Sequence, residues 1–413
     1  MTAAALGRER FAPSPVTELH SLVTVRERCG NIARAVEEGR TSHFRVQRDR
    51  LDDAASLVAD VTRERYPDLR IPGHSRWRHF DVGGIDRKAL VDRELAGASS
   101  ADIARARIDL AVISVLLDAG AGPQWHYREA QTGNVYARSE GLAVATLRAF
   151  LDGAFSSRPD EPCRVDALAL SRIDDARLAR IFQVTRDNPI VGLSGRVALL
   201  RRLAHALADE SRFGVAARPG ALFDVLTRGA TVQTIEASAV VAALLARLND
   251  IWLTGSVHDG VPLGDTWRHP AAGGAGSSSG WVPFHKLTQW LAYSLFEPVE
   301  WAGVQVEGQD ALTALPEYRN GGLLLDSGVI ALVDDALAIP HWSVGSALVV
   351  EWRALTVTLI DELAARVRTL LRRPDLPLAC VLEGGTWAAG RQLASQRRDG
   401  AAPLAIDSDG TVF

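Results

Sequence analysis

The segment VVEWRALTVTLIDELAARVRTLLRR, residues 349–373, constrains the fold of this chain more than any other. Its apolar residues recur at helical spacing, and arginines gather near its C-terminal end, where the helix dipole favours positive charge. Shorter segments carry the same helical pattern or are apolar nearly all round, namely 99–120, 198–210, 236–250 and 284–297. A chain with so many helical segments is expected to fold as a mainly α protein.

Signals for β-strands are few. The best is PLACVLE, residues 377–383, which we predict to be a short strand. Gly384 and Gly385 follow it and lead into a segment that favours a helix. Free N–H groups at such a helix start are able to hold an anion, although an ordinary tight turn is the simpler interpretation. The prediction is therefore a mainly α fold with a few short strands.

Composition excludes several classes of protein. The chain has 413 residues, 47% of them hydrophobic, so it can bury a large core, and its net charge of −4 gives no overall positive field for nucleic acid. No apolar run is long enough to span a membrane, and the first residues show no secretory signal. Cys29, Cys163 and Cys380 are far apart and odd in number, which argues against a disulfide framework. We expect a cytoplasmic protein without nucleic-acid or membrane partners.

Familiar metal and phosphate motifs are missing from the sequence. It contains neither the C-x-x-C nor the H-E-x-x-H spacing of zinc sites, so we expect no metal site. The phosphate-binding pattern G-x-x-x-x-G-K-[ST] is missing as well. Candidate chemistry must therefore come from clusters of polar residues, of which four stand out.

The first cluster is GHSRWRHFDVGGIDR, residues 73–87. Arg76 and Arg78 offer fork-shaped donors for phosphate or carboxylate, and Trp77 between them offers a stacking surface. His79 follows directly. The alternative interpretation is an exposed basic loop with one half-buried tryptophan.

The second cluster is LGDTWRHP, residues 263–270, in which Asp265 precedes Trp267. The alternative to a functional role is that Asp265 only caps a turn.

The third cluster, PFHKLTQW, spans residues 283–290 at the start of an apolar helix. His285 and Gln289 are four residues apart and are expected to share one face of that helix. Lys286 points elsewhere, and a buried lysine is rare unless it is paired. A functional interpretation is favoured for this cluster.

The fourth cluster is PEYRNGGLLLDSGVI, residues 316–330. It places a carboxylate, a phenol, a guanidinium and an amide side by side as Glu317, Tyr318, Arg319 and Asn320. Glycines follow, and they allow the backbone to approach a ligand closely. The alternative is a surface ion pair in a turn, which would contribute little to stability.

Several stretches resemble the uracil catabolism protein 4 family, which is linked to a uracil-degradation route that passes through nucleotide intermediates. They are HSRWRHF, LGDTWRHP, PFHKLTQWLAYSLFEP, LPEYRNGGLLLD, VVEWRALTV and LEGGTWAAGR. The resemblance extends from about residue 15 to the C-terminal DSDGTVF and implies that residues 1–413 form a single unit. The break LDGAFSSRPDEP, 151–162, leaves room for two lobes, 1–155 and 156–413, of which the second carries most of the candidate site.

A more distant likeness connects the chain to the queuosine salvage proteins, which resemble helical DNA glycosylases and hydrolyse the N-glycosidic bond of a modified nucleoside 5′-phosphate. Their F-[YH]-K-x-x-Q helix, acidic-Tyr-Arg turn and E-x-R helix resemble residues 284–289, 317–319 and 351–353. This likeness implies a DNA-glycosylase-like arrangement of helices. The sequence has Glu317 where those relatives usually have aspartate, and Ser294 where they tend to carry an acid.

The resemblance implies a hydrolase that cuts ureido-ribose 5-phosphate, a ring-opened uridine monophosphate, into urea and ribose 5-phosphate without a metal or organic cofactor. The reaction passes through an oxocarbenium-like sugar, so it needs a carboxylate near C1′, for which Glu317 and Asp265 are both candidates. The leaving urea needs a proton donor, for which His285 and Tyr318 are candidates.

The remaining roles concern substrate binding. Asn320 and Gln289 are candidates for reading the ureido group. The candidates for the 5′-phosphate are Lys286, Arg319, Arg76 and Arg78, with His79 and Trp267 as further substrate-binding residues. We expect Glu351 and Arg353 to support the site from behind rather than to contact the substrate.

Two other classes of function stay open. One is an amidohydrolase that cuts the ureido C–N bond, although the chain lacks a metal-ligand set or an activated serine or cysteine. The other is a non-catalytic nucleotide-binding or regulatory protein that uses the same arginines. Products separate the two enzymes, and turnover of any kind excludes the regulatory protein.

Overall fold

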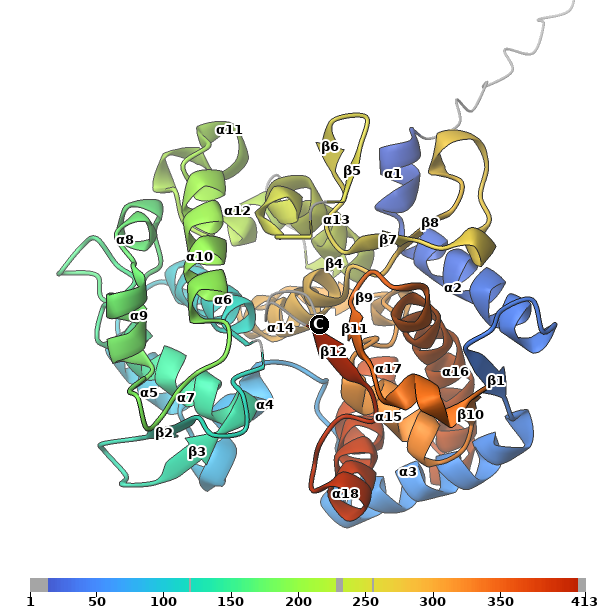
Figure 1. The fold of residues 1–413 in the computed structure, drawn as a ribbon. Helices are drawn as coiled ribbons and strands as arrows, with labels where there is room; N and C mark the ends of the chain where they lie inside the picture. Colours follow the sequence, from blue (N-terminus) through green and yellow to red (C-terminus); the bar gives the residue numbers. More distant parts are fainter. Residues whose placement is uncertain (1–13, 119, 228–232, 255, 408–413) are drawn as a thin grey trace, which may run out of the picture.

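The computed structural model describes residues 14–407 except for 119, 228–232 and 255. The chain is mainly helical with a few short strands, as the periodicity predicts (Figure 1). The resemblance to DNA glycosylases stays a prediction, and the last residues of the resemblance, 408–413, lie outside the described residues. No helix of the described residues is both long and apolar enough to cross a membrane.

The longer helices include all five that the sequence predicts. Serine side chains cap two of the five predicted helices, because Ser99 accepts a hydrogen bond from the Asp102 amide and Ser346 from the Val349 amide. The longer helices are α2 (Leu22–Glu37), α3 (Leu51–Arg65), α6 (Ser100–Leu116), α7 (Arg138–Leu151), α10 (Leu193–Leu207), α13 (Ala237–Leu248), α14 (Lys286–Trp301), α15 (Tyr318–Asp326), α16 (Ala347–Leu371) and α18 (Trp387–Arg398). The shorter ones are α1 (Pro15–Leu19), α4 (Trp77–Phe80), α5 (Lys88–Glu94), α8 (Ala167–Ser171), α9 (Asp175–Ile181), α11 (Glu210–Phe213), α12 (Ala221–Thr227) and α17 (Leu378–Val381).

The described strands form two-stranded pairs that connect helices. Four pairs are antiparallel, namely β1 (Phe44–Val46) with β10 (Ile330–Leu332), β2 (His126–Arg128) with β3 (Val135–Ala137), β5 (Val257–His258) with β6 (Val261–Pro262), and β7 (Thr266–Arg268) with β8 (Trp281–Pro283). Two pairs are parallel, namely β4 (Thr234–Glu236) with β9 (Gln305–Glu307) and β11 (His341–Ser343) with β12 (Ala405–Asp407).

Helices from the two ends of the chain pack together. The N-terminal helices α2 and α3 lie against α16, on the right of Figure 1 with α15, α17 and α18. Helices α5 to α10 gather on the left, and α14 lies between the two groups and packs on α6 and α13. One apolar cluster of buried residues extends from Leu22 to Leu404. The division into lobes at residue 155 stays a prediction.

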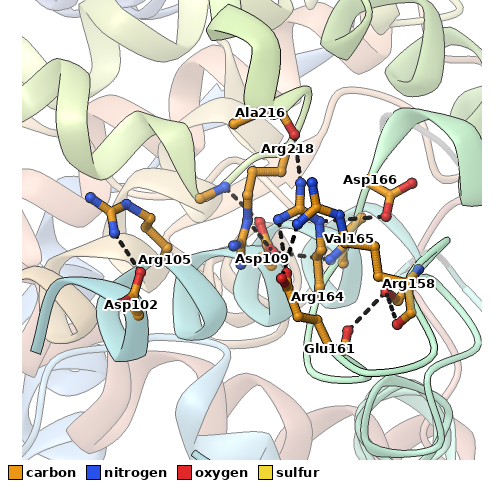
Figure 2. A network of polar contacts seen from close by, with 12 residues as sticks. Asp102, Arg105, Asp109, Arg158, Glu161, Arg164, Val165, Asp166, Ala216 and Arg218 are labelled. Carbon is orange, nitrogen blue, oxygen red and sulfur yellow. Dashed lines mark hydrogen bonds and ion pairs between the residues drawn. The ribbon is translucent and has the colours of Figure 1, made fainter. Parts of the chain in front are cut away.

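A buried carboxylate fixes α6 to the connections around it. Asp109 is fully buried, and its Oδ2 accepts hydrogen bonds from Nε and Nη2 of Arg218 at 2.9 and 2.6 Å and from the Val165 amide at 3.0 Å. Its Oδ1 accepts from the Gly220 amide at 2.6 Å. Figure 2 shows Arg218 and Arg164 converging on this point. The carboxylate is already satisfied within the protein, so we interpret this network as structural.

The strand prediction for residues 377–383 is wrong. This segment forms α17 and the beginning of a π-helical turn, Leu382–Thr386, which continues directly into α18. A short apolar run has no periodicity that separates a strand from a buried helix, and here tertiary packing decides for the helix. The amides of Gly384 and Gly385 therefore lie inside a continuous helical run and not at a free helix start.

Close packing of α18 on α15 depends on Gly390. A Cβ at this position would overlap the carbonyl oxygen of Arg319, which is backbone and cannot turn away. We expect Gly390→Ala to lower the free energy of unfolding by about 1–3 kcal/mol in a chemical denaturation experiment. Gly30→Ala is the matched control, because Gly30 lies in α2 with open space around it. That variant is expected to be about 0.5–1 kcal/mol more stable, and equal effects of both would contradict the packing argument.

Candidate active site

A pocket of about 440 Å³ lies where the starts of three helices meet. Arg138, Lys286 and Tyr318, the first residues of α7, α14 and α15, all line it. Its volume is within the usual range for small-molecule sites. Helix N-termini carry free N–H groups and partial positive charge, so a place where three of them meet favours an anionic ligand.

Glu317 is held in a fixed position at the start of α15. Its Oε2 accepts a hydrogen bond from the Arg319 amide at 2.8 Å, and its Oε1 accepts one from the Asn320 amide at 2.7 Å. Each carboxylate oxygen keeps a further lone pair for a ligand. The Asn320 amide group donates to the Leu315 carbonyl at 3.1 Å, whereas its Oδ1 is buried without a partner among the described residues. This end of the pocket therefore offers a carboxylate and a free amide oxygen.

Lys286 is a lysine in a chain whose positive residues are nearly all arginines. Of the 46 Lys and Arg residues, only Lys88 and Lys286 are lysines. Burial lowers the pKa of the Lys286 ammonium group, and the charges of Glu317 and Asp118 oppose that change. A compact, rotatable ammonium group thus lies near two carboxyl groups of the pocket lining.

Asp118 is a second carboxyl group of the pocket. Its Oδ2 lies 2.8 Å from Nη1 of Arg76, and its Oδ1 accepts a hydrogen bond from the Ser139 hydroxyl. Burial raises the pKa of Asp118, and the charge of Arg76 opposes that increase. Arg76 is fully buried behind Asp118 and does not line the pocket. The prediction that Arg76 binds phosphate is therefore not supported by its placement.

His79 lines the pocket as a neutral ring. Its Nδ1 lies 2.7 Å from Nη1 of Arg76, and because a guanidinium group only donates, Nδ1 accepts and the ring proton is on Nε2. Burial, followed by the charge of Arg76, holds the pKa of His79 well below its usual value. His79 can therefore donate a hydrogen bond from Nε2 but does not carry a charge.

Arg319 lies between two aromatic rings. Its guanidinium carbon is 4.5 Å from the ring centroid of Trp387 and 5.1 Å from that of Tyr318. The residue is only 6% exposed, and no ion pair joins it to a carboxylate of the described residues. A nearly buried cation without an acidic partner favours an anionic ligand.

Asp265 does not line the pocket. Its oxygens accept hydrogen bonds from Nη1 and Nη2 of Arg353 at 2.7 and 2.6 Å, and Oδ2 also accepts from the Lys286 amide at 2.9 Å. Nε of Arg353 donates to the Pro316 carbonyl at 3.3 Å. The pair joins the first residue of α14 to the residue before Glu317. The prediction that Asp265 acts at C1′ is not supported by this placement.

His285 and Gln289 face the protein core. Nε2 of His285 donates to the Leu19 carbonyl at 2.8 Å, and the Gln289 side chain binds Thr313 through both its amide nitrogen and its oxygen. Lys286, Leu287 and Trp290 of α14 line the pocket, whereas Gln289 and His285, which precedes the helix with left-handed backbone, point inward. The predicted catalytic role of His285 and the predicted ureido contact of Gln289 are not supported by this geometry.

Three further candidates also lie outside the pocket. Arg78 pairs with Glu297, and Nε1 of Trp267 donates to Asp265 at 2.7 Å. Glu351 accepts hydrogen bonds from two histidines, His43 and His269, if both donate from the ring nitrogen that faces it. Glu351 and Arg353 thus contact other parts of the protein and not the pocket.

Several residues that line the pocket were not predicted from the sequence. They come from segments far apart in the chain, and no local pattern of the sequence connects them. These residues are His74, Asp118, Arg138, Ser139, Trp290 and Trp387. In the part of the chain that the structure describes, no three His, Cys, Asp or Glu side chains are arranged to hold a metal ion.

Comparisons with known proteins cover nearly the whole chain. Residues 18–413 match the family described as "Protein of unknown function (DUF1688)". The chain is 36% identical over 436 residues to "Uracil catabolism protein 4" of Lachancea kluyveri, which covers 97% of this chain and 99% of the relative. It is 37% identical over 408 residues to "Protein urg3" of Schizosaccharomyces pombe, with coverage of 96% and 99%. The chain belongs to the DUF1688 family, together with these two fungal proteins.

Proposed function

We propose that this protein acts in uracil catabolism, as a hydrolase that cuts the N-glycosidic bond of ureido-ribose 5-phosphate and releases urea and ribose 5-phosphate. The pathway comes from the name of the Lachancea kluyveri relative. The observation that carries the reaction is the pocket itself, in which a fixed carboxylate, Glu317, lies with two cations, Lys286 and Arg319.

In this proposal Glu317 acts at C1′. Cleavage of a glycosidic bond builds positive charge on the sugar, which a preorganised carboxylate stabilises. The two backbone amides that hold Glu317 prevent the carboxylate from turning away, and its free lone pairs can accept a proton from the attacking water. Lys286 and Asp118 line the same pocket, and in this proposal they bind the ribose hydroxyls.

Arg319 and the helix starts would bind the phosphate. Arg319 has no carboxylate partner in the described part of the chain. The three helix starts add positive potential, and the first turn of α7, which no side chain caps, adds N–H donors. The rings of Trp387 and Tyr318 keep the guanidinium group in place. Phosphate binding away from the reacting bond then helps to orient the sugar.

The direct test is to incubate the purified protein with ureido-ribose 5-phosphate and to quantify both products. Equal amounts of urea and ribose 5-phosphate support the proposal. Release of ammonia with the sugar still attached would indicate an amidohydrolase instead. Binding without any turnover would indicate a regulatory protein.

Arg319→Met tests the phosphate contact. We expect kcat/KM for the phosphorylated substrate to fall by about 10- to 100-fold, because a hydrogen bond to a charged group contributes about 1.5–3 kcal/mol. For the same substrate without its phosphate, kcat/KM should fall only slightly. Arg391→Met is the matched control, since Arg391 lies over the same Trp387 ring but pairs with Glu140 and does not line the pocket. Equal losses on both substrates would contradict the assignment.

A further inference from the structure

The π-helical turn Leu382–Thr386 places a carboxylate beside the pocket. Such turns are rare and are frequently found at functional sites. Here the turn packs tightly on α3, because a Cβ on Gly385 would overlap the Val58 carbonyl oxygen and the Thr62 hydroxyl. Arg65 of α3 donates to the carbonyl oxygens of Glu383 and Gly384. Contacts with α3 therefore fix the backbone that carries Glu383.

Glu383 holds a histidine that lines the pocket. Its Oε2 lies 2.7 Å from Nδ1 of His74, and its Oε1 accepts hydrogen bonds from Arg65 at 3.2 Å and from the Tyr66 hydroxyl at 3.3 Å. Burial acts to raise the pKa of Glu383, but the hydrogen bonds and charges of His74 and Arg65 outweigh it and keep that pKa below its usual value. An ionised carboxylate only accepts, so Nδ1 of His74 carries a proton.

The ring of His74 is held in one orientation. Its centroid lies 4.5 Å from that of Trp290, with the rings tilted by 39°, and its backbone amide donates to the Ala379 carbonyl. Because Nδ1 is bound to Glu383, Nε2 is the nitrogen left for a molecule in the pocket. A carboxylate in this position stabilises the imidazolium form, as it does in catalytic triads.

The other histidine of the pocket lining is unsuited to giving up a proton as an imidazolium. Nδ1 of His79 accepts a hydrogen bond from Arg76, whose charge disfavours a second positive charge nearby. Lys286 lies near the negative charges of Glu317 and Asp118, and these charges favour the form of Lys286 that keeps its proton. Of the pocket-lining residues that the structure describes, His74 is the histidine paired with a carboxylate.

We propose that His74, oriented by Glu383, is the general acid that protonates the leaving urea. This inference rests on the proposed hydrolysis of the N-glycosidic bond. The C1′–N bond breaks, its electron pair stays with the nitrogen, and that nitrogen takes the proton from Nε2 of His74. Water adds to C1′ and loses a proton to Glu317, from which it passes to solvent. His74 is then protonated again, so the net reaction consumes one water.

A comparison of two leaving groups tests this role. Urea needs a proton to leave, whereas nitrophenolate leaves as a stable anion, so 4-nitrophenyl riboside 5-phosphate does not need the acid. We expect His74→Gln to lower kcat for the ureido substrate by about 10²-fold or more, with a much smaller loss for the nitrophenyl substrate. Glu383→Gln should show the same preference with a smaller loss, because it keeps an acceptor for Nδ1 but removes the charge.

The controls separate this inference from the proposed function. His341→Gln should change neither rate, since His341 forms a comparable pair with Asp407 on the surface, at 3.1 Å, outside the pocket lining. Equal losses on both substrates in the folded His74 and Glu383 variants, or a higher KM with kcat unchanged, would overturn the role of His74. If the wild-type protein cleaves neither substrate, the proposed hydrolysis itself fails.

Discussion

Glu317→Gln is expected to lower kcat for ureido-ribose 5-phosphate by about 10²- to 10³-fold, the usual effect of removing one preorganised electrostatic group from an active site. The glutamine keeps the shape of the side chain and one oxygen that accepts a helix amide, so substrate binding should change much less than kcat. The free energy of unfolding should fall by about 1 kcal/mol, because part of the helix cap is lost. Product release and chemical denaturation measure the two effects separately.

Asp174→Ala is the matched control for the lost cap, because alanine cannot accept the helix amide. Asp174 is an exposed cap of α9, where it accepts a hydrogen bond from the Arg177 amide at 2.7 Å, and it does not line the pocket. We expect this variant to lose stability to a similar extent and to keep full activity. Full activity of Glu317→Gln would place the essential carboxylate elsewhere, and Asp118 would then be the next residue to replace.

Asp265→Ala is expected to lower the free energy of unfolding by about 3–5 kcal/mol, because it leaves a buried guanidinium group without its carboxylate. Asp265 and Arg353 are 3% and 1% exposed, so water does not replace the lost partner. Activity should fall too, since Asp265 holds the Lys286 amide and Arg353 holds the Pro316 carbonyl. Urea denaturation of wild type and variant measures the change in stability.

Asp60→Asn and a double variant control this result. Asp60 pairs with Arg63 on the surface at 2.8 Å, and the loss of such an exposed pair should cost at most about 1 kcal/mol. The double variant Asp265→Leu/Arg353→Met should recover much of the stability, because it removes both buried charges together. If Asp265→Ala retains wild-type stability but loses all activity, Asp265 has a direct role in the reaction after all.

Five helices, α6, α10, α13, α14 and α16, were predictable from the sequence because each carries its own signal. Segment 349–373 shows the apolar periodicity of α16, and Ser99 marks the start of α6. Segment 377–383 carries no such signal, since its apolar residues fit a strand or a buried helix equally well. Its contact with α3, through Gly385, selects the helix, and that contact is not visible in the local sequence.

The candidate site was predictable only where its residues are neighbours in the chain. Glu317 and Arg319 stood out because several polar chemistries occur together there. Asp118 follows α6 and Ser139 lies in the first turn of α7, and they join Lys286 at the pocket only when α6 packs on both α14 and α7. The buried pair of Asp265 was not predictable for a related reason, because its partner Arg353 is far away in the sequence.

The scarcity of lysine has a practical consequence for chemical labelling. Apart from the α-amino group, an amine-reactive reagent can modify only Lys88 and Lys286. Lys88 forms an i,i+4 pair with Asp92 and does not line the pocket. In a Lys88→Arg variant, Lys286 is the one side-chain amine left for a fluorophore or an isotope tag. A ligand in the pocket should protect Lys286 from the reagent. The extent of labelling would then report whether the pocket is occupied, in cell extracts too, without an assay of turnover.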